Sequence, residues 1–139
     1  MRRIRPRVLL VVVTAAAPIA CHEVTAPAPC DGSISVSIGF GSQPTFAWSP
    51  ACGISELVVS TVPANATEVE RQIWGFSVSE QAPIGPRVDY GKSPRNATIW
   101  TGPEAITAGK TYRVTVRYTV GGDVVSASGS GTFTWFPPD

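Results

Sequence analysis

The clearest pattern in the chain is a strict alternation of apolar and polar residues over 111–120. Its apolar positions are Tyr112, Val114, Val116, Tyr118 and Val120. A β-strand turns successive side chains to opposite faces, so this segment is predicted to be a strand with one face on a core and one face in water. Aromatic and β-branched residues fit such a half-buried, pleated surface.

Seven further segments are predicted to be strands, and turn residues separate them. They are 33–40, 45–49, 56–62, 72–79, 87–90, 98–101 and 124–135. Proline and glycine between the segments end each strand, because proline lacks the N–H that a central strand needs. Gly121-Gly122 tolerates two consecutive positive φ angles, so the last two strands are predicted to form a hairpin.

The alternation predicts an all-β fold, and no segment shows helical periodicity for three turns. Seven or eight short strands within residues 31–136 favour an antiparallel two-sheet sandwich. A closed barrel is the alternative, and the irregular strand lengths favour the sandwich. Residues 137–139 are expected to be a short C-terminal tail.

Composition and charge narrow the range of partners. A chain of 139 residues with 13 Gly and 13 Pro has room for one turn-rich domain. Four arginines lie within the first seven residues, whereas from residue 21 onward seven Lys or Arg face ten Asp or Glu, a formal charge of −3. A mildly acidic body without a basic cluster argues against binding to nucleic acid, and against a polybasic surface of the protein that would bind a membrane.

The first 20 residues have the three parts of a secretory signal peptide. A cationic segment (1–7) precedes a strongly apolar one (8–13), and a small-residue segment (15–20) follows. The whole apolar run is about half of the roughly 20 residues that span a bilayer, so a permanent transmembrane helix is the weaker interpretation. The protein is therefore expected to be exported.

The segment Pro18-Ile19-Ala20-Cys21 resembles a bacterial lipobox. The resemblance implies that Cys21 becomes diacylated, that residues 21–30 form a proline-stiffened tether, and that the membrane is a partner through this anchor. Pro18 departs from the aliphatic residue that the family prefers. By the same resemblance to Gram-negative lipoproteins, His22 after the lipidated cysteine favours the outer membrane. The alternative is a plain secreted protein in which Cys21 is a free thiol.

The chain has three cysteines, and an odd number in an exported protein leaves one thiol unexplained. If Cys21 carries lipid, Cys30 and Cys52 remain and can pair in an oxidising compartment. The predicted strands place Cys30 just before the first strand and Cys52 just after the second, where antiparallel neighbours bring them together. A metal site is not expected, because two thiols without a nearby histidine lack the usual four ligands.

Three motifs together resemble a fibronectin type III domain, an immunoglobulin-like fold. They are Pro44-Thr-Phe-Ala-Trp48-Ser-Pro50, Leu57-Val-Val-Ser, and Ile106-Thr-Ala-Gly109-x-x-Tyr112-x-Val114-x-Val116. The resemblance implies that Trp48 is the core tryptophan and that the Tyr112 hydroxyl bonds to nearby backbone. The segments around Trp74 and Trp100 depart from the family. The resemblance also extends to bacterial surface lipoproteins, which implies a binding or structural module without catalytic residues.

No catalytic constellation or cofactor site is expected. The only histidine, His22, lies in the tether, and Glu68 and Glu70 are interpreted as a solvated edge beside Arg71. The predicted function is an envelope interaction or structural module, with an envelope protein or a glycan as the partner. Candidate contacts are Trp100, Trp135, Arg113 and Arg117. A carbohydrate-binding module using both tryptophans is the alternative function, whereas capping of the fold by the tryptophans, and a solvated face for the arginines, are the structural alternatives.

Overall fold

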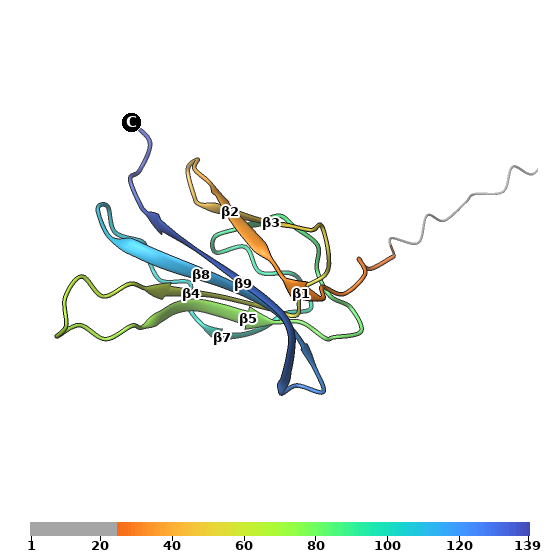
Figure 1. The fold of residues 1–139 in the computed structure, drawn as a ribbon. Coiled ribbons are helices and arrows are strands. Elements are labelled where there is room, and N and C mark those ends of the chain that lie inside the picture. The colour runs from red at the N-terminus through yellow and green to blue at the C-terminus, as the bar shows by residue number, and fades with distance from the viewer. Residues whose placement is uncertain (1–24) are drawn as a thin grey trace, which may run out of the picture.

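The computed structural model describes residues 25–139, in which the chain forms two β-sheets and no helix (Figure 1). The nine strands are β1 (Gly32–Ser33), β2 (Ser35–Gly39), β3 (Thr45–Ser49), β4 (Glu56–Thr61), β5 (Gln72–Ser77), β6 (Val88–Asp89), β7 (Thr98–Thr101), β8 (Thr111–Val120) and β9 (Val124–Thr134). The all-β prediction is confirmed for this part of the chain. The predicted signal peptide, Cys21 and His22 lie outside the described residues.

The strands divide unequally between the sheets. Six strands form one sheet in the order β1-β9-β8-β4-β5-β7, and three form the other in the order β2-β3-β6. All neighbours are antiparallel except β1 and β9, which run parallel. The longest strands, β8 and β9, lie side by side within the larger sheet (Figure 1).

The predicted hairpin between the last two strands is confirmed. β8 pairs with β9 from Thr111↔Thr134 to Val120↔Val124. Gly121 and Gly122 have φ angles of 65° and 84°, which is the left-handed region that glycine adopts without a steric penalty. A register shift between Tyr118 and Thr119 separates the outer end of the hairpin from its regular part. Without this shift Val125 would continue the inward alternation of Ala127, whereas with it Val125 faces away from the core and is 50% exposed.

The first predicted strand is two strands in two different sheets. β1 pairs with the beginning of β9, the Ile34 amide donates to the Ser128 carbonyl (3.0 Å), and β2 then pairs with β3. The alternation in sequence is the same on both sides of this crossing, so it did not reveal the change of sheet. Phe40, the last residue of the predicted strand 33–40, lies beyond the end of β2 and is 63% exposed.

Side chains from both sheets form one buried cluster. It includes Phe46 and Trp48 from the smaller sheet, and Leu57, Trp74 and Val114 from the larger one. Trp48 is thus a core residue, as predicted. On the inner face of β9, Gly129 and Gly131 lie against β2, where a Cβ at Gly129 would be 2.0 Å from the Ile34 carbonyl oxygen. The absence of side chains there allows the two sheets to approach closely.

The parallel strand β1 covers only the beginning of β9, because it pairs with Ala127 and Ser128 alone.

The two ends of the strands differ in what they carry. The N-terminal segment and the β8–β9 turn lie at one end, and the β4–β5 loop lies at the other (Figure 1). Among residues 25–139, no helix is long and apolar enough to cross a membrane.

Candidate functional site

The outer face of the six-stranded sheet, defined as the face turned away from the core, carries most of the candidate residues. Inward-facing Leu57, Trp74, Phe76, Val114 and Val116 fix the opposite orientation of their neighbours. Strand register then places Gly75, Val58, Thr115 and Ser130 in one row across the outer face.

Trp100, on the edge strand β7, lies across Gly75 in this row. A Cβ at Gly75 would lie 2.3 Å from the Trp100 indole Nε1 and 2.8 Å from Cε2, so any larger residue would displace the ring. Trp100 nevertheless remains 43% exposed, and β5 and β7 change register between Gly75 and Phe76 where it sits. The indole is thus held against the backbone of β5 while part of it faces solvent.

Val58 shows that this outer face is partly covered. It pairs with Gly75 on one side and Thr115 on the other, and it is only 8% exposed although it faces away from the core. In the sequence, the adjacent pair Val58-Val59 does not show which face of β4 is buried. Both are buried, Val59 in the core and Val58 on the outer face.

Arg113 and Arg117 lie on the same face of β8, each two residues from Thr115, so one is on each side of this row. The Arg113 Nη1 lies 3.0 Å from Glu70 Oε2, and the Arg117 Nη1 lies 3.8 Å from Glu56 Oε2. Each arginine therefore has a carboxylate partner, so the face alternates in charge and has no strongly basic patch. Such exposed pairs contribute only about 0–1 kcal/mol each to stability, which leaves their side chains free to exchange partners.

Trp135 does not belong to this face. It continues the inward alternation of β9 and is 5% exposed, with its amide donating to the Lys110 carbonyl (3.0 Å). Trp135 is therefore a buried residue, and two exposed tryptophans do not form one platform. The structure places Trp100, Arg113 and Arg117 on one face, with Trp100 on β7 and the arginines three strands away on β8, whereas Trp135 lies in the core.

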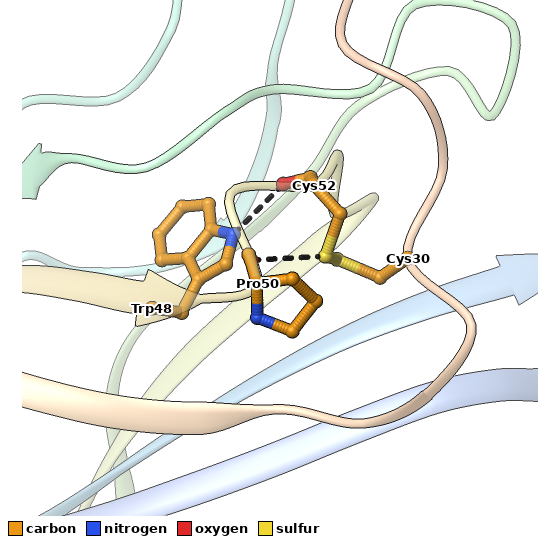
Figure 2. The surroundings of a disulfide bond; sticks show 4 residues. All are labelled: Cys30, Trp48, Pro50 and Cys52. Carbon is orange, nitrogen blue, oxygen red and sulfur yellow. Dashed lines mark hydrogen bonds between the residues drawn. A yellow bond between two sulfur atoms is a disulfide. The ribbon is translucent and has the colours of Figure 1, made fainter.

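The predicted disulfide between Cys30 and Cys52 is present, with a Cα–Cα distance of 4.8 Å (Figure 2). The Trp48 indole Nε1–H donates to the Cys52 carbonyl (2.8 Å), and the Cys30 amide donates to the Gly53 carbonyl (2.8 Å). These contacts fix the N-terminal segment to the end of β3, at the end of the strands where that segment joins the domain.

The titratable groups with shifted pKa values have structural partners. Hydrogen bonds from Lys92 and Thr45 lower the pKa of Asp89 below its usual value. Burial raises the pKa of Tyr90 to about 12, and its hydroxyl donates to the Glu104 carbonyl (2.6 Å). Among residues 25–139, no three His, Cys, Asp or Glu side chains gather as a metal site would require. These groups are therefore assigned structural roles.

Sequence reasoning missed Gly75, Val58, Glu56 and Glu70 as parts of the outer face. Gly75 carried a usable signal, since a glycine inside a strand marks a place where another group approaches the backbone closely. The two glutamates carried none, because their partners are 43 residues and 61 residues distant in sequence. No protein-family model, curated protein or solved structure matches this chain.

Proposed function

We propose that the protein is an exported, lipid-anchored β-sandwich that acts as a non-catalytic interaction module of the cell envelope. The observation that carries the proposal is the outer face of the six-stranded sheet, where Trp100 on β7 is held half-exposed on the same face as Arg113 and Arg117, three strands away on β8. A face that combines a rigid, half-exposed aromatic ring with exchangeable charged groups has the composition of a recognition surface.

An immunoglobulin-like sandwich is the proposed form of the fold. Two features support it: side chains of both sheets share one core, and the Tyr112 hydroxyl accepts a hydrogen bond from the Thr107 amide (2.8 Å). The corner tyrosine of the fibronectin type III resemblance implied a bond of this kind. The chain departs from that family after β6, since it returns to the larger sheet as β7 beside β5.

The anchor is supported by the use of the cysteines. Cys30 and Cys52 bond to each other, which leaves Cys21 as the one cysteine for which the lipobox resemblance supplies a role. The proposed anchor is tested with Cys21→Ser in the full chain. The variant is expected to leave the membrane fraction, and a Cys30→Ala/Cys52→Ala variant is expected to remain there. Continued membrane association of Cys21→Ser would contradict lipidation.

The binding face is tested by photo-crosslinking in the native envelope. A photoreactive amino acid is placed at Trp100 and, as the matched control, at Phe136, which is also an exposed aromatic residue (66%). Partners are expected to crosslink from position 100 and not from position 136. Crosslinks from position 136 alone, or from neither, would argue against the outer face as the site of interaction.

Carbohydrate binding is the second candidate function, and the exposed Trp100 indole favours it. An aromatic ring stacks on the apolar face of a sugar, while neighbouring arginine and glutamate side chains bond to its hydroxyl groups. Trp100→Ala is then expected to abolish retention on the envelope glycan, and Phe136→Ala to leave it unchanged. Equal retention of both variants would exclude a sugar as the ligand of this face.

A further inference from the structure

The end of the β8–β9 hairpin carries an exposed apolar cluster that the outer face does not explain. We call it the valine tip, and it consists of Val120, Val124 and Val125, which are 49%, 66% and 50% exposed. Isolated exposed valines are ordinary, but three within six residues on one projecting turn form a patch. Exposed apolar side chains concentrated at one turn mark contact with an apolar partner.

The valine tip presents apolar side chains on more than one side. Val120 pairs directly with Val124, while Val125 pairs with Thr119 one step further along the ribbon. Paired residues face the same side of a ribbon and neighbouring pairs face opposite sides, so the two pairs point in opposite directions. A tip with apolar groups on both sides suits insertion into a medium better than docking on a flat protein surface.

Two hydrogen bonds to Glu80 hold the tip in place. The Gly121 amide donates to the Glu80 carboxylate (2.8 Å), and the Tyr118 hydroxyl donates to the Glu80 carbonyl (3.1 Å). Both bonds reach the loop after β5, so the hairpin end is fixed relative to the larger sheet.

The valine tip lies at the same end of the strands as the N-terminal tether (Figure 1). β1 runs parallel beside Ala127, three residues from Val124. Pro27, which precedes β1 in the chain, lies near Gly53 and Gly85. A Cβ at Gly53 would be 3.0 Å from the Pro27 carbonyl oxygen, and a Cβ at Gly85 would be 3.5 Å from the Pro27 Cγ. The tether therefore reaches the domain beside the tip and not at the far end.

Chain length then limits how far this end can stand from an anchor at Cys21. Six residue steps connect Cys21 to Pro27. Even a fully extended chain of that length spans only about 20 Å. An anchor at Cys21 therefore keeps Pro27 near the bilayer surface, and with it the end of the domain that carries the valine tip.

From this placement we propose that the valine tip inserts into the bilayer surface that holds the anchor. The inference rests on the proposed lipidation of Cys21. Insertion of a few apolar side chains adds a second contact to the acyl chains and fixes the orientation of the domain. The nearby acidic groups, Asp123 at the turn and Glu80 beside it, favour a zwitterionic surface over an anionic one, since like charges repel.

The test uses the lipidated full chain in vesicles of zwitterionic phosphatidylcholine. In Val124→Cys the new thiol is the only free one, because Cys21 carries lipid and Cys30 is bonded to Cys52. It is labelled with an environment-sensitive fluorophore, and brominated lipids serve as quenchers. The expected result is a blue-shifted emission that the brominated lipids quench, with a smaller shift when the vesicles are anionic.

The matched control is Val69→Cys with the same label. Val69 is also an exposed valine (84%), but it lies in the β4–β5 loop at the opposite end of the strands. No shift and no quenching are expected there. Flotation with the vesicles but equal emission at positions 124 and 69 would overturn the insertion alone. Failure of the labelled protein to float with the vesicles would overturn the anchor, and the insertion with it.

Discussion

Tyr90 and Trp74 illustrate how single residues satisfy, or fail to satisfy, their polar atoms in this core. The rings pack edge to face with centroids 5.1 Å apart, and the Tyr90 hydroxyl donates to the Glu104 carbonyl (2.6 Å). The Trp74 indole Nε1 has no hydrogen-bond partner among the described residues, whereas that of Trp48 donates to Cys52. An unbonded buried N–H costs about 1–3 kcal/mol, so Trp74 stabilises the fold through packing alone.

The pKa of Tyr90 predicts a loss of stability at high pH. Burial raises the pKa of its phenol from 10.0 to about 12 in the folded protein. Below the pKa of this phenol in the unfolded chain, the folded and unfolded states both keep the proton, and the contribution of Tyr90 to the free energy of unfolding is fully present. As the pH rises from about 10 to 12, the unfolded chain ionises first, so the free energy of unfolding falls across this interval.

Tyr90→Phe is expected to weaken this dependence on pH. The variant should lose about 1 kcal/mol near neutral pH, where the bond to Glu104 is broken, and should show a shallower fall above pH 10. Urea unfolding of both proteins over the alkaline range measures the difference, because ionisation elsewhere is common to both. Parallel curves for the two proteins would refute the raised pKa.

At the scale of the elements, the fold depends on how closely β2 lies over β9. A Cβ at Gly129 would be 2.0 Å from the Ile34 carbonyl oxygen, which is rigid backbone. A Cβ at Gly131 would be 2.9 Å from Ile38 Cδ1, the end of a side chain that can rotate. The two glycines therefore differ in what a methyl group would have to move.

Gly129→Ala is expected to destabilise the protein more than Gly131→Ala. A methyl group at residue 129 has to displace the Ile34 backbone, which should cost about 3 kcal/mol or more. A methyl group at residue 131 only requires the Ile38 side chain to rotate, which should limit the cost to about 1 kcal/mol. Ser130→Ala, on the outer face between them, is the control and should change stability by less than about 0.5 kcal/mol. Chemical denaturation ranks the three, and equal costs for both glycines would contradict the close approach.

The elements that local pattern determines were predictable, and those that depend on distant contacts were not. β8, its pairing with β9 and the Gly121-Gly122 turn followed from alternation and turn chemistry, which act within a few residues. The division of 33–40 between two sheets did not, because the same alternation suits either sheet. The burial of Val58 also escaped prediction, since Trp100 approaches its row from a strand 40 residues further along the chain.

The candidate site was predictable in its residue types and not in its assembly. Arg113 and Arg117 share a face because they lie two apart in one strand, which the sequence shows directly. Trp100 joins them only through the pairing of β7 with β5 and the missing side chain at Gly75. Trp135 followed the inward alternation of β9, and that pattern was the better guide to its burial than its position at the end of the strand.

For the whole molecule, the disulfide joins the N-terminal segment to the part of the domain that contains Trp48. Cys30 is 1% exposed and Cys52 is 9% exposed, so the bond belongs to the edge of the core. It closes a loop with a sequence separation of 22 residues that includes β1, β2 and β3. The smaller sheet is thereby tied to the larger one through β1.

Cys30→Ala/Cys52→Ala is expected to lower the free energy of unfolding by about 3 kcal/mol, because the unfolded chain gains freedom that the crosslink had removed. Denaturation of the oxidised protein, the reduced protein and the variant measures the loss. The reduced protein and the variant should behave alike. A variant as stable as the oxidised protein would show that the crosslink has no effect on stability.

If the protein is anchored as proposed, the place where its N-terminal segment joins the domain also determines which direction the outer face points. The N-terminal segment leaves at one end of the strands (Figure 1). A domain held by that end stands with its strands rising from the surface, so the face that carries Trp100 is turned sideways, parallel to the strands. Such a domain would engage a ligand that runs alongside it, such as a neighbouring protein or a glycan strand at the same height. Copies fixed to the same surface would present this face at one uniform level.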